Sequence, residues 1–294
     1  MSAIRKFKSL DCLLLSIPLT ILIFTNGWPL LNNIIQSFSQ KHSGVVSYNF
    51  QNYISVIKDT TFWITLTNSL IVLTYIPVTI IMGILLSVLI YNNFIGRKLF
   101  IYIIFFPQIL PTVAIGKIFS SFFGLKGPMN GLISRLGYRG EDIYWLGNPK
   151  LSFIVIIVCI TWLSFGWQTL IFNNALSAID KNVKELVELD GVPFFRSIVQ
   201  IYLPSLKNTI VYSVFINLLL GFSGIFPLIF ILTNGGPGYQ TSTLDYIVYL
   251  KAFGPEARIG ESYALAIILL IIILLLLSGF YFFYYLLGKH NIED

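Results

Sequence analysis

Polar, uncharged side chains recur at helical spacing inside long apolar runs, and they are the groups of this chain best suited to bind a small molecule. Residues three or four apart in a helix lie on one face. The candidates are Gln108 and Thr112 in one run, Thr161, Ser164 and Gln168 in a second, and Ser213 and Asn217 in a third. Their hydroxyl and amide groups, with Trp162 and Trp167 nearby, suit hydrogen bonding and stacking to a hydroxyl-rich solute.

The same stripes have a second interpretation, which is packing between helices. Small and polar residues mediate helix contacts in any membrane bundle. For Gly221 and Gly224, which continue the stripe of Ser213 and Asn217, packing is the favoured interpretation. For Asn217 and Gln168 a place in a solute pathway is favoured instead.

Lys117 is the only basic residue in the interior of an apolar run. It lies near the outer end of its run, so we expect its long side chain to reach the membrane interface. The competing hypothesis is that Lys117 contacts an anionic substrate, such as a sugar that carries a carboxylate.

Signatures of catalysis are absent from the sequence, which has no GxxxxGKS/T phosphate loop, no HExxH and no GxSxG. Its only histidines are His42 and His290, and its two cysteines, Cys12 and Cys159, lie inside apolar runs, so we expect neither a metal site nor a disulfide. No carboxylate falls in the middle of a run, which argues against a proton-coupled carrier. We therefore expect no enzymatic activity and no cofactor in this chain, and an energy source outside it.

The elements that position these residues are membrane-spanning helices. The chain of 294 residues is 56% hydrophobic and 11% charged, whereas soluble domains average roughly 25% charged residues. A span needs about 20 apolar residues to cross the hydrocarbon core. The sequence has six such runs, at 11–31, 64–90, 99–123, 151–174, 207–233 and 263–287. They predict an all-α integral membrane protein with six transmembrane helices, kinked in the third at Pro107 and Pro111.

Two domains are expected, 1–63 with the first span and an outside amphipathic segment, and 64–288 with the remaining spans. In the outside segment, Phe50, Tyr53, Ile54 and Ile57 fall at helical spacing and predict an interfacial helix. A second short amphipathic piece is expected near 244–253.

Positive charge indicates the orientation. The net charge of +6 is spread over loops, which argues against a nucleic-acid partner. With the N-terminus in the cytoplasm, inside segments carry ten Lys or Arg and outside segments eight, and the very short loop with Arg97 and Lys98 falls inside. We expect both termini in the cytoplasm, together with the segment 180–206.

That cytoplasmic segment is the most polar interior stretch of the chain. Asp180 suits a helix N-cap, and Gly191 followed by Pro193 suits a sharp helix end and a restart. Leu203 and Pro204 mark the entrance to the fifth span. We expect a helix, a tight turn and a second helix, presented to a partner in water.

The order Glu185, then Gly191, then Leu203–Pro204 resembles the EAA signature of permease subunits of binding-protein-dependent ABC importers. Three further stretches resemble the sugar importers, most of all the first permease of maltose and glycerol-phosphate systems. These are NFQNYISVIKDTTFW, YWLGNPK and LTNGGPGYQTSTLDYIVYLKAF, so the resemblance covers roughly 45–288. One departure is that Leu186 and Val187 stand where the family has alanines.

The resemblance implies a type I ABC importer fold and a multi-pass protein of the bacterial cytoplasmic membrane, surrounded by lipid. It implies a second, similar permease, two ATPase subunits that bind ATP and Mg²⁺, and an external solute-binding protein as partners. The coupling helix would dock on the ATPase, and its residues here are Glu185, Leu186, Val187, Asp190, Gly191, Leu203 and Pro204. The transported solute would be an oligosaccharide, with an acidic sugar as one possibility, moved by alternating access.

Three alternatives stay open at the level of sequence. The segment 180–204 is a solvated loop in which Glu185 pairs with Lys181 or Lys184, or it regulates a stand-alone channel or secondary carrier. The third is a polyol phosphate in place of a sugar as the substrate.

Overall fold

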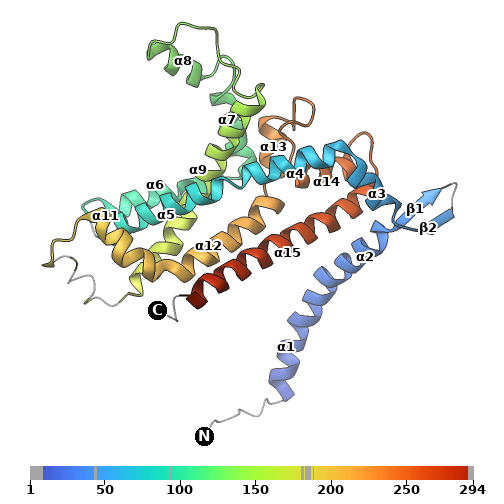
Figure 1. The fold of residues 1–294 in the computed structure, drawn as a ribbon, viewed down its shortest axis with the longest axis horizontal. Coiled ribbons are helices and arrows are strands. Elements are labelled where there is room, and N and C mark those ends of the chain that lie inside the picture. Colours follow the sequence, from blue (N-terminus) through green and yellow to red (C-terminus); the bar gives the residue numbers. More distant parts are fainter. Residues whose placement is uncertain are drawn as a thin grey trace. The chain divides into compact units, whose positions relative to one another are not determined.

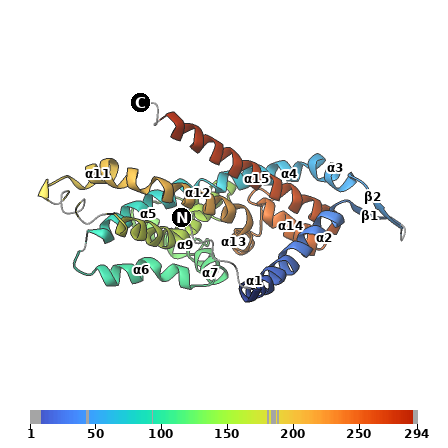
Figure 2. The ribbon, with the colours of Figure 1, turned by 90° about the horizontal axis from the view of Figure 1, so that it is seen from below.

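The computed structural model describes residues 9–42, 45–92, 94–179, 182, 187 and 189–290. Its chain divides into two units, one of residues 1–59 and 248–270 and one of residues 60–247 and 271–294. Figures 1 and 2 show that helices are the main elements of both, as the apolar composition predicts.

The larger unit holds most of the apolar runs. Its helices are α4 (Thr60–Val72), α5 (Tyr75–Tyr91), α6 (Arg97–Ile109), α7 (Thr112–Phe122), α8 (Pro128–Arg135), α9 (Pro149–Ser177), α11 (Phe194–Ser197), η2 (Ile198–Tyr202), α12 (Leu203–Ser223) and α13 (Phe226–Leu232). The unit also includes the start of α14 (Leu244–Phe253) and the end of α15 (Ile259–His290).

Helix α9 is the central element of this unit and packs most extensively against α5 and next against α6. Figures 1 and 2 both show α5 and α9 lying together. A Cβ added to Gly83 of α5 would lie 2.8 Å from the Cβ of Gln168, and one added to Gly166 would lie 2.4 Å from the carbonyl oxygen of Ile104 in α6. Glycine at these two positions therefore lets α5 and α6 approach the backbone of α9.

The third predicted span is broken. Helices α6 and α7 meet at an angle of 98°, and the break falls at Leu110 and Pro111. Pro111 has no N–H to continue the helix and pushes Leu110 into an extended conformation. Among the described residues, five helices are long and apolar enough to cross a membrane, or six if the bent pair is one span.

The fifth predicted span, 207–233, differs from the structure at its C-terminal end. Helical structure begins before it, at Phe194, and runs through a π-helical turn, η2, to Ser223. It then breaks at Gly224, and α13 begins at Phe226. The apolar run continues across this break, so hydropathy alone does not reveal it.

The smaller unit contains α1 (Ser9–Leu22), η1 (Ile23–Gly27), α2 (Trp28–Ser37) and α3 (Gln51–Lys58). Between α2 and α3 lies an antiparallel hairpin, β1 (Ser39–His42) and β2 (Val45–Tyr48), which the sequence analysis did not predict.

Helix α3 forms where the outside amphipathic segment is predicted, and the face opposite to the predicted apolar one packs against the protein. Ile54 and Ile57 of the predicted apolar face are 42% and 49% exposed, whereas Asn52 and Val56 are buried. The amide of Asn52 donates to the carbonyl oxygens of Ser37 and Ser39, both at 2.9 Å. Asn52 thus joins α3 to the start of the hairpin, while Ile54 and Ile57 remain exposed, and their place at a membrane interface stays a prediction.

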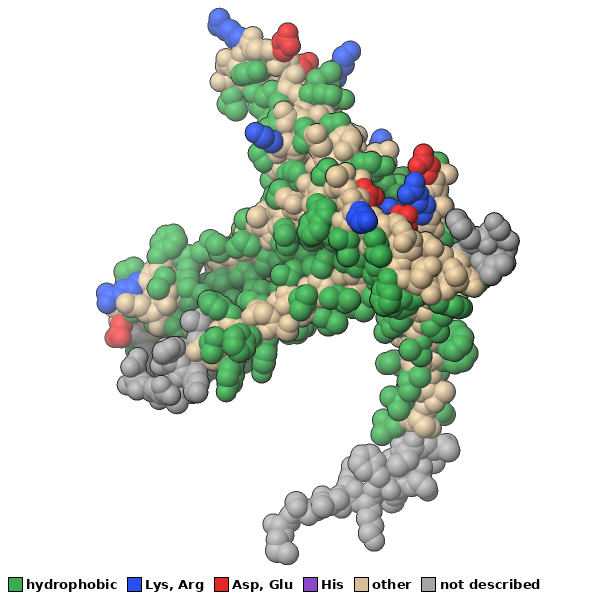
Figure 3. Space-filling model, turned by 45° about the vertical axis from the view of Figure 1, so that its right-hand side comes forward, with side chains coloured by type: hydrophobic (Ala, Val, Ile, Leu, Met, Phe, Trp, Pro, Cys, Tyr) green, Lys and Arg blue, Asp and Glu red, His purple; other side chains and the backbone are tan. Residues whose placement is uncertain are grey.

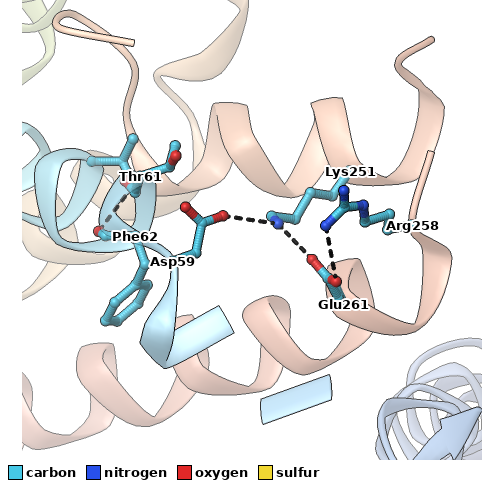
Figure 4. Close-up of polar contacts among 7 residues, drawn as sticks. Asp59, Thr61, Phe62, Lys251, Arg258 and Glu261 are labelled. Carbon is cyan, nitrogen blue, oxygen red and sulfur yellow. Dashed lines mark hydrogen bonds and ion pairs between the residues drawn. The ribbon is translucent and has the colours of Figure 1, made fainter. Parts of the chain in front are cut away.

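A group of charged side chains ties together the C-terminal end of α3, helix α14 and the start of α15 (Figure 4). The Lys251 ammonium lies 2.6 Å from a carboxylate oxygen of Glu261 and 3.3 Å from one of Asp59. The more exposed Arg258 reaches the other oxygen of Glu261 at 3.4 Å. Lys251 is therefore the shared cation of this charged cluster.

Hydrophobic side chains cover most of the face seen in Figure 3, while charged side chains occur in small separate groups. Many large apolar residues are more than half exposed, including Phe24, Trp28, Tyr102, Ile109 and Phe282. A surface of this kind suits contact with lipid hydrocarbon or with other membrane helices.

Candidate functional site

A cavity of about 550 Å³ opens among the helices of the larger unit. It is lined by residues from the start of α5, the α6–α7 break, α9, α12 and the α12–α13 break, so each of these elements contributes to one space. The lining residues are Tyr75, Gln108, Leu110, Thr112, Ile160, Leu163, Ser164, Trp167, Gln168, Tyr212, Ile216, Asn217, Leu220, Gly224, Ile225 and Leu228. None of these side chains is charged, and this central cavity combines three aromatic rings with amide and hydroxyl groups.

The structure brings five of the eight predicted pathway residues to the central cavity, namely Gln108, Thr112, Ser164, Gln168 and Asn217. Thr161 and Ser213 are buried in the same helices but are not among the residues that line it. The role of all eight in transport stays a prediction. Helical spacing accounts for Ser164 and Gln168 on α9, whereas Gln108 and Thr112 lie on α6 and α7, on either side of the break.

Gln168 is the lining residue whose hydrogen bonding is incomplete. Its side chain is 1% exposed, and its Oε1 atom has no hydrogen-bond partner among the described residues. A buried acceptor without a partner costs about 1–3 kcal/mol. Gln168 therefore has an acceptor, at the wall of the cavity, that no described residue satisfies.

Hydrogen bonds to main-chain oxygens hold the walls of the cavity. The Tyr75 hydroxyl donates to the carbonyl oxygen of Asn217 at 2.9 Å and so joins the start of α5 to α12. The Asn217 amide donates to the Ser213 carbonyl oxygen at 2.7 Å. The Gln108 amide donates to the Leu163 carbonyl oxygen and joins the α6–α7 break to α9.

One small residue, Gly221, lets α12 approach the junction of α4 and α5. A Cβ added to Gly221 would lie 2.6 Å from Leu73 Cδ2, which agrees with the packing role predicted for that glycine. Gly224 instead meets only its own helix at such distances and lies where α12 ends. Its predicted packing role is therefore not what the structure shows, because Gly224 lines the cavity at the break.

Asp245 is the residue of this region that the sequence analysis missed. Its carboxylate accepts hydrogen bonds from the N–H groups of Ile225 and Phe226, at 3.1 and 2.7 Å, at the start of α13. It also accepts from the Thr243 hydroxyl at 2.5 Å. Burial raises the pKa of the Asp245 carboxyl, while these donors act in the opposite direction. The available signal was a carboxylate within the apolar segment TSTLDYIVYL, at the start of the predicted piece near 244–253.

Lys117 lies apart from the central cavity. It lines a separate hollow of about 590 Å³ whose other described lining residues are Ala114, Ile118, Ser121, Phe122 and Pro128. Lys117 is thus an exposed cation beside an apolar wall, and both its place at the membrane interface and its contact with an anionic substrate stay predictions.

The predicted coupling segment is described only in part. Glu185 and Leu186 lie outside the described residues, as do Asp180, Lys181 and Lys184. Val187 is helical, Asp190 is an exposed turn residue, and Gly191 has φ +59°, the left-handed conformation that the sequence predicts. The chain then enters α11 after Pro193, and Leu203 and Pro204 form the first turn of α12. Within the described residues, no group of His, Cys, Asp and Glu side chains is arranged to hold a metal ion.

Comparison with known proteins gives the family. The family model for the inner membrane component of binding-protein-dependent transport systems matches residues 76–291. The lactose transport system permease of Rhizobium radiobacter is 29% identical over 231 residues, 77% of this chain and 77% of the relative. The sulfoquinovosyl glycerol permease of Agrobacterium fabrum is 29% identical over 221 residues, 74% of this chain and 70% of the relative.

A solved structure has the same fold. It is a bacterial ABC transporter involved in the import of the acidic polysaccharide alginate, with a TM-score of 0.79 and 20% sequence identity, and the match covers 95% of this chain and 96% of that one. The helices described above therefore form the transmembrane fold of an ABC importer permease. From the matched residues and this fold, the chain belongs to the family of binding-protein-dependent transport system inner membrane components.

Proposed function

We propose that this chain is the permease subunit of an ATP-driven importer that moves a sugar or oligosaccharide across the bacterial cytoplasmic membrane. The observation that carries the proposal is the central cavity, with Trp167 and two tyrosines beside the amides of Gln108, Gln168 and Asn217. Such groups hydrogen-bond sugar hydroxyls and stack on the apolar faces of sugar rings. The relatives support the same class, since their names refer to lactose, to trehalose and maltose, and to sulfoquinovosyl glycerol.

The working complex contains this chain, a second permease, two ATPase subunits and an external solute-binding protein. ATP and Mg²⁺ are bound by the ATPase subunits. Residues 64–288 form the transmembrane domain, both termini face the cytoplasm, and the segment 180–205 docks on an ATPase subunit. The left-handed turn at Gly191 supports this role, because it ends one helix close to the start of the next.

Transport follows from a population shift between two global states. Closure of the ATPase subunits on ATP moves the coupling segment, and the permease pair opens outward to accept the sugar from the solute-binding protein. Hydrolysis then returns the pair to the inward-facing state. In this cycle, the residues of the central cavity bind the sugar during its passage.

The test is uptake by the complete complex in proteoliposomes, with lactose, maltose, sulfoquinovosyl glycerol and an alginate trisaccharide as radiolabelled probes. We expect ATP-dependent uptake of one of these sugars, and none by this chain alone. Transport by this chain without ATPase subunits or ATP would instead identify a stand-alone carrier. Uptake of glycerol phosphate in place of every sugar would assign the substrate to the polyol phosphates.

A further inference from the structure

We propose that Asp245 is a positioning residue for transport, which holds the floor of the central cavity in place. The floor is the break between α12 and α13, where Gly224, Ile225 and Leu228 line the cavity. The Asp245 carboxylate binds the N–H groups of Ile225 and Phe226, which no carbonyl of a preceding turn can satisfy at a helix start. The inference rests on the proposed function, in that the cavity is taken as the sugar pathway.

The carboxylate is anchored from its own side. One oxygen, Oδ1, accepts from the Thr243 hydroxyl at 2.5 Å and from the Tyr246 N–H at 2.9 Å. The other oxygen, Oδ2, is the atom bound to Ile225 and Phe226. Asp245 therefore uses both carboxylate oxygens, Oδ1 to fix its own side chain and Oδ2 to cap the start of α13.

The loop that carries Asp245 is fastened in turn to α4. The Asn68 amide donates to the carbonyl oxygens of Tyr239 and Ser242, at 3.2 and 2.9 Å. The Leu244 N–H donates to the Ser69 hydroxyl oxygen at 2.9 Å. The segment 241–244 is almost fully buried, at 0–1% exposure, although the turn-rich sequence before it is typical of a surface loop. The loop is thus a fixed support rather than a mobile connection.

These contacts form one chain of hydrogen bonds from α4, through the loop and Asp245, to the residues that line the cavity. A change at Asp245 is transmitted to Ile225 without altering any side chain that faces the solute. The expected signature is a weaker apparent affinity for sugar in complexes that still assemble. A residue that only stabilised the fold would reduce the amount of complex and leave the affinity of the remainder unchanged.

The experiment compares Asp245→Asn with wild type in the complete complex. Asparagine has the same shape, but it loses the charge and one acceptor oxygen. With the panel sugar that wild type transports best as the probe, we expect KM to rise on the order of tenfold, equivalent to about 1.4 kcal/mol. The maximal rate per assembled complex should change less than KM. Asp142→Asn is the matched control, since it removes the same charge from an exposed loop residue and should leave KM unchanged.

Thr243→Val is the second variant, and it keeps the carboxylate while removing the hydroxyl that orients it. We expect a smaller rise in KM, and Thr243→Ser should restore the wild-type value. If Asp245→Asn does not assemble, Thr243→Val carries the test, and an unchanged KM in that variant overturns the inference. Hydrogen exchange gives a readout that needs no substrate. We expect faster exchange of the peptide 224–232 in Asp245→Asn, or in Thr243→Val if Asp245→Asn does not assemble. Unchanged exchange of this peptide also overturns the inference.

A failure of the inference differs from a failure of the proposed function. If Gln168→Ala and Asn217→Ala raise KM and Asp245→Asn does not, the cavity is the pathway and only the role of Asp245 is wrong. If none of the three changes KM while all assemble, the cavity is not the pathway.

Discussion

The side chain of Gln168 meets opposite demands from packing and from solute binding. Its Oε1 is buried without a described partner, so a well-packed apolar replacement should not cost stability at this atom. We predict that Gln168→Leu leaves the thermal midpoint of the complex unchanged or raises it. We also predict that the variant raises KM for the transported sugar about tenfold, the effect of losing one hydrogen bond of about 1.4 kcal/mol.

Thr79→Val is the matched control for this prediction. Thr79 is 0% exposed, its Oγ1 also lacks a partner among the described residues, and it does not line the central cavity. Thr79→Val should therefore leave the thermal midpoint of the complex unchanged or raise it, and it should not change KM. Equal KM values for Gln168→Leu and wild type would count against a contact between Gln168 and the solute.

The packing of helix α9 depends on close approach to the neighbouring helices. A Cβ on Gly166 would lie 2.4 Å from the main-chain oxygen of Ile104, which cannot rotate away as a side chain can. We predict that Gly166→Ala destabilises the protein by about 1–3 kcal/mol, the usual cost of overpacking. The thermal midpoint of the protein in detergent, monitored by size-exclusion chromatography after heating, measures the loss of stability.

Gly131 of α8 provides the comparison, because a Cβ there meets no described residue within 4 Å. Gly131→Ala should be neutral or stabilising by roughly 0.5–1 kcal/mol, since alanine is the better helix former. If both variants keep the wild-type midpoint, the close contact of α6 with α9 is not a constraint on the fold.

The charged cluster around Lys251 gives a second prediction about elements. Lys251 serves both Glu261 and Asp59, and its side chain is 15% exposed. We predict that Lys251→Met lowers the free energy of unfolding by about 1–3 kcal/mol, because it leaves a largely buried carboxylate with a weaker partner. Arg258→Gln should cost less than about 1 kcal/mol, since Arg258 is 60% exposed and water screens its ion pair. Equal losses would show that Lys251 is not the shared cation.

The elements also show which parts of the fold can be predicted from sequence. Hydropathy and length predict the spans because each must cross the hydrocarbon core, and Pro111 predicts the break between α6 and α7 because its chemistry is local. The break after Ser223 was not predicted, since the apolar run continues through Phe226–Leu232. Its cap, Asp245, lies about 20 residues further along the chain, so the cause is non-local.

At the scale of the whole molecule, the residues of the cavity also divide into those that the sequence pattern predicts and those that it cannot distinguish. Helical spacing brought Gln168 and Ser164 to one face, and the structure places both at the central cavity. The same spacing could not separate Ser213, which is buried between helices, from Asn217, four residues away, which lines the cavity. Distinguishing these two requires the positions of neighbouring helices, which a single helical pattern does not contain.

Coupling is the property of the whole complex, and Gly191 is the described residue that best tests it. Its φ of +59° is a conformation that most side chains disfavour and that asparagine tolerates. A Cβ at Gly191 meets none of the described residues within 4 Å, so a substitution there tests the backbone conformation and contact with a partner subunit. We predict that Gly191→Val lowers sugar uptake per ATP hydrolysed by at least about threefold, because about 1 kcal/mol or more disfavours the left-handed turn.

Gly191→Asn separates the two causes. If the turn positions the helices on either side of it, asparagine should retain most of the coupling while valine does not. If both variants lose coupling equally, the surface around Gly191 contacts a partner directly, and bulk rather than backbone conformation decides the outcome. Wild-type uptake per ATP in both would remove this turn from the path by which ATP hydrolysis drives transport. Amounts of assembled complex, measured before each assay, keep a loss of assembly distinct from a loss of coupling.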